Sequence, residues 1–451
     1  MGKVLRVAVV GAGPAGLYTA DALLFQRDVP VEVDVFDRLP TPFGLLRYGV
    51  APDHLKMKSL TKVLQRTLDD DRVRFFGSVV IGKDLTVEEL RARYHAVVYA
   101  FGASTDRGLG VPGEALPGSA SATHFVHWYS GHPDVPADTF RLDAEAVAVV
   151  GVGNVAIDVT RMLLKDAGAL RRTDIPDPVL DVLAASKVRE VHLLGRRGPA
   201  HASFTSKELR ELGNLEGVDV VVDPAQLELD DVTAARCADN PDVQRNLTIL
   251  REWSGRPRSA AARSLHIRFW TRPVELRGEG ALQAVVLEET TLSGAGAVVS
   301  TGRRTEIPVQ LLLRSIGYRG VAVAGVPFDE ERGTVPSVDG RVSRDGASPP
   351  GEYVAGWIGR GPVGVLGTNK SDAEVVVQRL LSDAAFLTAG SSQLSDVTTL
   401  LRGRKVAFVD CSGWGAIDAA EVARGAERER PRAKIATWAE LLVAAHSADV
   451  V

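Results

Sequence analysis

Residues 4–37 read VLRVAVVGAGPAGLYTADALLFQRDVPVEVDVFD, and this stretch decides the fold. An apolar run predicts a buried strand, the glycine-rich run a tight turn, and the residues after it a helix. In this spacing Gly11 permits the turn, Gly13 lets a pyrophosphate approach the backbone, and Gly16 lets the helix pack close to the strand. The N–H groups of the first helical turn then face the phosphates. The stretch therefore predicts a dinucleotide site.

A second apolar strand, Val31–Phe36, ends at Asp37. This carboxylate lies about 20 residues beyond the glycines, where an acid can accept hydrogen bonds from ribose hydroxyls. The alternative is a glycine turn in an ordinary βαβ unit, but strand, helix and acid in register favour nucleotide binding. A signal peptide is rejected, because three glycines and a proline interrupt its would-be apolar core.

The composition excludes several classes of protein and of site. The chain has 451 residues, 45% of them hydrophobic, which allows two or three domains with a large core. No run approaches the ~18 apolar residues of a membrane span, and a net charge of −4 argues against general nucleic-acid binding. The two cysteines, Cys237 and Cys411, form no C-x-x-C, which excludes such a thiol-disulfide site, a cysteine-ligated iron–sulfur cluster and a disulfide scaffold. We expect a cytoplasmic protein with no metal site.

The segment after Asp37 has a composition unsuited to packing. Residues 39–54 carry three prolines and two glycines, which predicts a loop with a fixed path, of the kind that lines sites. Helical periodicity over 55–68 and apolar runs at 73–76 and 96–101 predict a helix and two further strands. We place a linker and a domain boundary near residues 111–114.

A second glycine turn follows the apolar strand Ala146–Val150. It reads GVGNVA over residues 151–156, with alanine in the third glycine position. The next strand, Glu190–Leu194, leads to Arg196 and Arg197 where an acid would otherwise meet the ribose. Two guanidinium groups suit a 2′-phosphate, so this site is predicted to bind NADP rather than NAD. A solvated arginine pair is the alternative, and an insertion over 165–187 lengthens the spacing.

Each glycine turn is followed later in the chain by a further apolar strand that ends on glycine, which predicts two nested domains. The run at 311–317 repeats the strand-to-glycine pattern of 96–102, and a further strand and glycine-rich helix start at 352–369 return the chain to the first domain. Amides at that helix start, which we expect to continue to about Leu381, can face the N1/O2 edge of a flavin. We therefore expect an α/β protein with two nested Rossmann-like domains: a discontinuous FAD domain (1–109 and 319–451) and an inserted NADP domain (110–318). Short helices are expected over 417–427 and 438–445.

Taken together, these stretches resemble one family, the adrenodoxin reductase-like ferredoxin–NADP reductases. The resemblance covers residues 3–380. It rests on the first glycine turn and on the stretches 42–54, 153–158, 195–199, 204–211 and 356–369. It implies FAD on the discontinuous domain, NADPH on the inserted one, and delivery of single electrons to a ferredoxin, which would serve a cytochrome P450 or a similar acceptor.

The resemblance also assigns roles to single residues. His54 and Asp158 match a polar pair that organises water and protons near the flavin, and Glu208 matches a contact on the nicotinamide side. Asp37 departs from the glutamate common in the family, a change that a shorter carboxylate tolerates. The cofactor-binding residues expected are Gly11, Gly13, Pro14, Ala15, Gly16, Asp37, Gly44, Leu45, Val79, Gly153, Asn154, Val155, Arg196, Arg197, Glu208, Trp357, Gly364, Val365 and Leu366.

Ferredoxins are acidic, so a reductase needs a basic docking face. Candidates gathered in one segment are Arg245, Arg251, Arg256, Arg258 and Arg263. An arginine-rich solvated surface is an equal alternative reading of that segment. Two other functions stay open: a flavin monooxygenase, which also needs FAD and NADPH, and a non-enzymatic NADP(H)-binding sensor. The sequence leaves the oligomeric state open between a monomer and a weak dimer.

Overall fold

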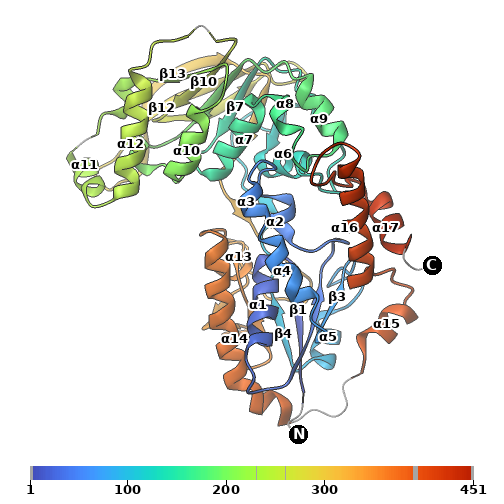
Figure 1. The fold of residues 1–451 in the computed structure, drawn as a ribbon. Coiled ribbons are helices and arrows are strands. Elements are labelled where there is room, and N and C mark those ends of the chain that lie inside the picture. Colours follow the sequence, from blue (N-terminus) through green and yellow to red (C-terminus); the bar gives the residue numbers. More distant parts are fainter. Residues whose placement is uncertain (1–3, 230, 260, 390–394, 448–451) are drawn as a thin grey trace. The chain divides into compact units, whose positions relative to one another are not determined.

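A computed structural model describes residues 4–229, 231–259, 261–389 and 395–447 of the chain. It divides into two compact units. Unit 1 comprises residues 1–105, 130–134 and 318–451, and unit 2 comprises residues 106–129 and 135–317. Both are layered α/β structures in which helices cover a parallel sheet (Figure 1). The predicted fold class, α/β with two Rossmann-like units and a discontinuous first unit, is confirmed.

Unit 1 is built on a seven-stranded sheet in the order β16-β17-β18-β4-β1-β2-β3. The strands from β18 to β3 run parallel, whereas β16 and β17 are antiparallel additions at one edge. Their bounds are β1 Leu5–Val10, β2 Val31–Phe36, β3 Val73–Phe76, β4 Ala96–Tyr99, β16 Ser337–Val338, β17 Arg341–Val342 and β18 Glu352–Val354.

Side chains alternate across this sheet and supply two cores. Val7 and Val9 of β1 face a core shared with α1, α4, α14, α16 and α17, while Ala8 and Val10 face one shared with α5 and α15. The helices, labelled in Figure 1, are α1 Pro14–Phe25, α2 Gly44–Tyr48, α3 Leu55–Lys58, α4 Thr61–Leu68, α5 Val87–Arg93, α13 Trp357–Arg360, α14 Leu366–Ala389, α15 Val397–Gly403, α16 Cys411–Ala426 and α17 Trp438–His446.

Unit 2 holds a six-stranded parallel sheet in the order β6-β14-β7-β8-β10-β9. A separate antiparallel sheet, β11-β12-β13, packs on one face of it through a shared core. The bounds are β6 Ser119–Ser121, β7 Ala146–Val150, β8 Glu190–Leu194, β9 Val218–Val222, β10 Arg263–Arg268, β11 Thr271–Arg277, β12 Ala284–Leu292, β13 Val298–Pro308 and β14 Leu311–Arg314. Short strands β5, Thr105–Asp106, and β15, Tyr318–Arg319, pair with each other.

Helices cover the other face of the six-stranded sheet. Buried side chains of α6, α7, α9, α10 and α12 join Val147 and Val149 of β7 in the largest core of unit 2. The bounds are α6 Ala122–Tyr129, α7 Asn154–Leu164, α8 Ala167–Leu170, α9 Asp177–Ala184, α10 Ser206–Gly213, α11 Asp231–Ala238 and α12 Pro241–Ser254, with 3₁₀ turns at Pro199–His201 and Pro224–Leu227. The insertion noted over 165–187 thus forms α8 and α9.

Three expectations from the sequence need correction. The loop over 39–54 contains the short helix α2, the helix expected over 55–68 is split into α3 and α4, and α14 extends to Ala389, beyond Leu381.

Residues 130–134 lie inside the expected inserted domain but belong to unit 1. The reason is local: Lys434 Nζ donates to Ser130 O at 2.9 Å, and Trp438 Nε1 donates to Asp134 Oδ1 at 2.8 Å.

Candidate nucleotide-binding sites

The first glycine turn joins β1 to α1 in unit 1. Gly11 N donates to Phe36 O at 2.7 Å, which ties the turn to the end of β2. A Cβ on Gly16 would lie 1.9 Å from Gly11 O, so only glycine allows this closeness of helix and turn. Gly13 is the N-cap of α1 and no side chain caps that end, while a Cβ on Gly13 would meet nothing nearer than 3.9 Å. The turn thus offers uncapped amides and open space, which fits a pyrophosphate.

Asp37 stands at the end of β2, as the sequence predicted. Its Oδ2 accepts from Ala12 N at 2.8 Å and its Oδ1 from Leu39 N at 2.9 Å. Burial raises the pKa of this carboxyl, and the two N–H groups oppose the rise. Asp37 therefore holds the backbone of the glycine turn in place. Each carboxylate oxygen keeps a second lone pair that can meet a ribose hydroxyl.

The proline-rich loop reaches the same turn. Phe43 N donates to Ala12 O at 2.8 Å, and a Cβ on Gly44 would lie 3.0 Å from Gly13 Cα. Gly44 and Leu45 begin α2 and so lie beside the glycine turn. Val79 sits in the core with 1% exposure, and its backbone N donates to Asp37 O at 2.9 Å. Its side chain is thus a packing group, and only its backbone is close to the acid.

The closing strand β18 completes the site in unit 1. Gly356 has φ +73°, and a Cβ on it would lie 2.5 Å from Ala15 Cβ, which places this glycine against the start of α1. Trp357 follows with a buried Nε1–H that has no hydrogen-bond partner among the described residues. Buried donors are normally satisfied, so this indole N–H fits a group that accepts from it when the site is filled.

The start of α14 lies after a second glycine loop. Gly364 has φ +94°, and its neighbours Val363 and Val365 are 68% and 65% exposed. Val365 N donates to Thr368 Oγ1 at 3.2 Å, and Leu366 is the first helical residue. Exposed apolar side chains on a loop at a helix N-terminus suit a planar ring system. The amides sit where the sequence placed them, at the start of the long helix.

His54 lies at the N-cap position of α3. Its side chain makes no capping hydrogen bond there, so the capping role considered from the sequence is not the one that His54 performs. His54 is half-buried at the end of the proline-rich loop.

The second glycine turn joins β7 to α7 in unit 2. Gly151 N donates to Leu194 O at 2.9 Å, and Gly153 is the N-cap of α7 with no capping side chain. Asn154 Oδ1 accepts from Thr205 N at 2.9 Å, and this bond holds the start of α10 against the turn. Val155 is half-buried in the first turn of α7. The second turn therefore presents uncapped amides as the first one does.

Arg196 and Arg197 follow β8 and are exposed. Their backbone is fixed, because Thr290 Oγ1 donates to Arg196 O at 2.9 Å and Trp270 N donates to Arg197 O at 3.3 Å. Within the described parts of the chain, neither guanidinium forms an ion pair or a hydrogen bond. Two fixed, unengaged arginines at this strand end suit a phosphate monoester.

Asp158 and Glu208 lie on adjacent helices of unit 2. Arg161 Nη2 donates to Asp158 Oδ1 at 2.6 Å, and its Nε lies 3.3 Å from Glu211 Oε2. Glu208 is buried on α10, with its Oε1 3.8 Å from Lys207 Nζ. Sequence reasoning missed Arg161 and Glu211; the i,i+3 spacing of Asp158 and Arg161 was the signal that could have found the first of them.

Some of the five predicted docking arginines form ion pairs or hydrogen bonds within unit 2, and others do not. Arg245 and Arg256 pair with Asp242 and Glu252 on their own helix or its end. Arg263 lies on β10 and donates to the carbonyls of Leu164 and Glu216. Its donors are therefore engaged within the unit, while its positive charge remains. Arg251 and Arg258 are exposed and form no ion pair within the described residues.

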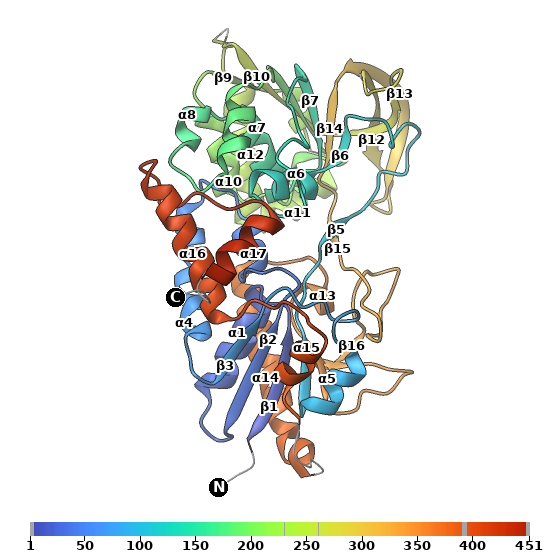
Figure 2. The same ribbon diagram turned by 90° about the vertical axis from the view of Figure 1, so that its right-hand side faces the viewer.

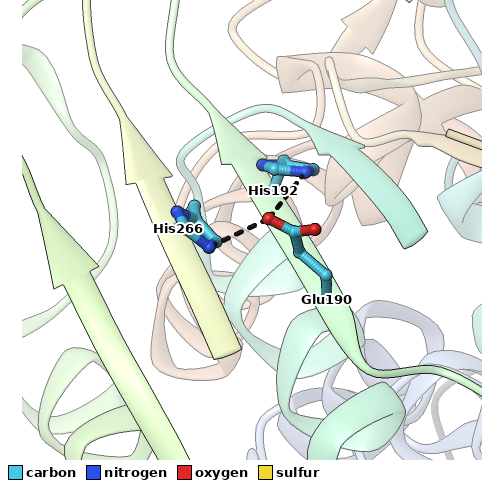
Figure 3. A group of neighbouring side chains, drawn as sticks. All are labelled: Glu190, His192 and His266. Carbon is cyan, nitrogen blue, oxygen red and sulfur yellow. Dashed lines mark ion pairs between the residues drawn. The ribbon is translucent and has the colours of Figure 1, made fainter. Parts of the chain in front are cut away.

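One cluster in unit 2 has the residue types of a metal site. Figure 3 shows Glu190 and His192 of β8 beside His266 of β10, with Glu190 Oε1 2.9 Å from His266 Nε2 and 3.4 Å from His192 Nε2. However, Arg268 Nε donates to His192 Nδ1 at 3.3 Å, which leaves the ring proton on Nε2, facing Glu190. Burial, Arg268 and His266 lower the pKa of His192 to about 3. Arg268 thus occupies one imidazole lone pair and places a positive charge beside the cluster, and both effects disfavour a divalent cation there.

No helix in the described ranges is long and apolar enough to cross a membrane.

The chain is similar to known proteins over nearly its whole length. Residues 5–232 match the family described as pyridine nucleotide-disulphide oxidoreductase. NADPH-ferredoxin reductase FprA of Mycobacterium tuberculosis is 44% identical over 97% of this chain and 98% of the relative. The mitochondrial NADPH:adrenodoxin oxidoreductase of Arabidopsis thaliana is 40% identical over 98% of this chain and 96% of the relative.

A solved structure agrees with these relatives. Mycobacterium tuberculosis FprA in complex with NADPH superposes with a TM-score of 0.92 and 43% identity, over 98% of this chain and all of that one. The agreement extends over both units and over the C-terminal segment that the sequence resemblance did not reach. The chain therefore belongs to the pyridine nucleotide-disulphide oxidoreductase family, among its NADPH-ferredoxin and adrenodoxin reductases, as the sequence resemblance indicated.

Proposed function

We propose that this protein takes electrons from NADPH, passes them through FAD, and delivers them one at a time to a ferredoxin. The observation that carries the proposal is the pair of uncapped glycine turns that differ in their strand-end charge. One is closed by the half-buried carboxylate Asp37 and the other by the unengaged pair Arg196 and Arg197. Relatives named for this activity match the chain over nearly its whole length.

Unit 1 is the proposed FAD site. Bound FAD supplies the chemistry that accepts two electrons together and releases them singly. The chain's own residues bind and orient it: the amides after Gly13 face the pyrophosphate, Asp37 accepts from the ribose, and the Trp357 Nε1–H donates into the site. The amides at the start of α14 stabilise negative charge at the ring edge. His54 is assigned to proton and water organisation.

Unit 2 is the proposed NADPH site. Arg196 and Arg197 hold the 2′-phosphate, and the amides that follow Gly153 face the pyrophosphate. Glu208 is placed toward the nicotinamide-side ribose, and Asp158 is fixed by Arg161. Electron transfer needs alignment of the two rings more than an acid or a base, so these residues act mainly by positioning.

The partner proposed is an acidic ferredoxin that serves a cytochrome P450 or a similar acceptor. Arg251 and Arg258 are the available members of the basic segment, and rim charges of this kind steer association. The exposed pairs of Arg245 and Arg256 contribute little and leave those side chains able to exchange partners. Neither cysteine forms a disulfide within the described residues, which fits a reducing compartment such as the cytoplasm.

One experiment separates the candidate functions. The purified protein is mixed with NADPH without oxygen, flavin bleaching is followed, and oxidised ferredoxin is then added. A ferredoxin reductase bleaches and then reduces ferredoxin. Bleaching without ferredoxin reduction, with oxygen and substrate consumed in equal amounts when air is admitted, identifies a monooxygenase. Nucleotide binding without a bound flavin identifies a sensor.

A further inference from the structure

The C-terminal helices hold the short helix α2 of unit 1. The segment 411–438, which contains α16 and the chain leading to α17, forms what we call the C-terminal brace (Figure 2). A five-residue helix is marginal by itself, because nucleation fixes several residues for few hydrogen bonds. The position of α2 therefore depends on what packs against it.

The brace makes two contacts here, one with the N-cap residue of α2 and one with a residue of α2 itself. The rings of Phe43 and Trp414 meet edge to face, with centroids 5.7 Å apart. One helical turn further along, Arg47 forms a bidentate pair with Glu421, at 3.0 and 2.5 Å. Trp414 and Glu421 are seven residues apart, about two turns, and therefore lie on one face of α16.

The charged contact is closed to solvent. Side-chain exposure is 4% for Arg47 and 0% for Glu421. Glu421 also accepts from Arg432 Nη1 at 3.1 Å and from Ile435 N at 2.8 Å. Burial raises the pKa of Glu421, but the guanidinium of Arg47 outweighs this and holds it below its ordinary value. All partners of the carboxylate thus come from α2 or from the brace.

Lys434 secures the other end of α2. Its Nζ is buried and donates to Arg47 O at 2.7 Å and to Ser130 O at 2.9 Å. A cation at the last turn of a helix stabilises carbonyls that lack intrahelical partners. The brace therefore fixes both the direction and the end of α2.

The first residue of α2 is Gly44, which lies against the glycine turn. A Cβ on Gly44 would lie 3.0 Å from Gly13 Cα, so a small shift of α2 changes the space above the turn. We propose that Glu421 is a positioning residue for FAD, which acts through Arg47 to hold Gly44 and Leu45 at the pyrophosphate-binding turn. This inference rests on the proposed function, because it requires FAD at that turn.

The test is the FAD affinity of Glu421→Gln, which keeps the shape of the side chain and removes its charge. Fluorescence of FAD released on dilution gives its dissociation constant, and we expect it to rise about 10-fold or more, since buried Arg47 loses its counter-charge. NADP⁺ affinity, which reports on unit 2, should stay within about twofold. Lys434→Met is the second variant, because it keeps the stem and removes both backbone contacts; we expect FAD affinity to fall here too.

Two controls separate positioning from general destabilisation. Glu427→Gln makes the same chemical change at the exposed end of α16 and should leave FAD affinity unchanged. Leu441→Ala opens the core at α17, where the side chain is 0% exposed, and should lower the melting temperature without a matching loss of FAD affinity. Equal loss of FAD affinity in Leu441→Ala and Glu421→Gln, at equal melting temperatures, would overturn the inference.

The outcome is also separable from the proposed function. A wild-type protein without FAD contradicts the proposed function itself. A wild-type protein that holds FAD, with Glu421→Gln and Lys434→Met both within about twofold of it in FAD affinity, contradicts only the role of the brace. If Glu421→Gln does not fold, Lys434→Met and Glu421→Asp decide the question by the same measurement.

Discussion

The two glycine turns share their backbone and differ in their surroundings. In both, the first glycine donates to the last carbonyl of the neighbouring strand, Gly11 to Phe36 and Gly151 to Leu194. In both, the helix that follows has no capping side chain. The first turn, however, is bound by a half-buried carboxylate, Asp37, whereas the second is followed by two exposed arginines.

This difference shows where specificity resides in such folds. The shared backbone supplies the helix N-terminus that any dinucleotide pyrophosphate uses. The strand-end side chain then decides between a free ribose hydroxyl and a phosphate, because an acid repels the phosphate that a guanidinium attracts. The predictions below change one turn and leave the other as the internal control.

The largest effect is expected from Arg196→Ala combined with Arg197→Ala. Two charge-assisted contacts of about 1.5 kcal/mol each correspond to a loss of about 100-fold in kcat/KM for NADPH. The value for NADH should change little, because NADH has no 2′-phosphate. Steady-state kinetics with both cofactors measure this, and equal losses with NADPH and NADH would show that the pair does not bind the phosphate.

Asp37→Asn tests the first turn. An amide nitrogen cannot accept from Ala12 N or Leu39 N, so one backbone donor loses its partner, and the ribose contact weakens as well. We expect the FAD dissociation constant to rise about 10-fold, with KM for NADPH unchanged. An increase in KM for NADPH without a change in FAD affinity would reverse the assignment of the two turns.

Glu352→Gln tests the strand that closes the first unit. Burial opposes ionisation of Glu352, but Arg344 and Tyr99 hold its pKa below the ordinary 4.5. Its contribution, about 1–2 kcal/mol, is therefore present above pH 4.5 and lost as pH falls through the lower folded value. Melting temperatures of wild type and variant should differ at about pH 7 and converge toward about pH 3. A constant difference would show that the charge is not responsible.

The smallest effect is expected at the docking surface. Arg251→Glu with Arg258→Glu should raise KM for ferredoxin about threefold at low salt, and the difference should shrink as ionic strength rises. Arg263→Lys is a matched control that keeps a charge in an engaged position. No change with the double variant at any salt concentration would place docking elsewhere.

Local patterns predicted the parts of the fold that depend on neighbouring residues. The strand before the first glycine turn, the strand Val31–Phe36 and the second turn at 151–156 lie within a residue or two of their predicted positions, and a helix follows the first turn as expected. Strand patterns, glycine spacing and helix starts are encoded locally. The antiparallel sheet β11-β12-β13 was not foreseen, since β11 and β13 are mostly polar strands without a continuous apolar run and β12 has a run of only four apolar residues, Ala284–Leu287.

Parts of the site that depend on distant contacts were missed. The pair Arg47 and Glu421 is separated by 374 residues, and no pattern near either residue indicates the other. The sequence predicts a loop at α2 because the prolines and glycines on either side of it dominate the local signal, whereas tertiary contacts with α16 stabilise the helix. Likewise, only the structure shows that the guanidinium groups of Arg196 and Arg197 have no partner among the described residues, whereas that of Arg263 donates to two carbonyls.

Residues 130–134 have a practical consequence for dissecting the molecule. The chain passes between the units after Thr105, Tyr129, Asp134 and Gly317. Expressing unit 2 as a single uninterrupted piece would carry along five residues whose partners, Lys434 and Trp438, stay behind. A stand-alone nicotinamide-binding fragment therefore needs those five residues replaced by a short polar linker as well as two new ends.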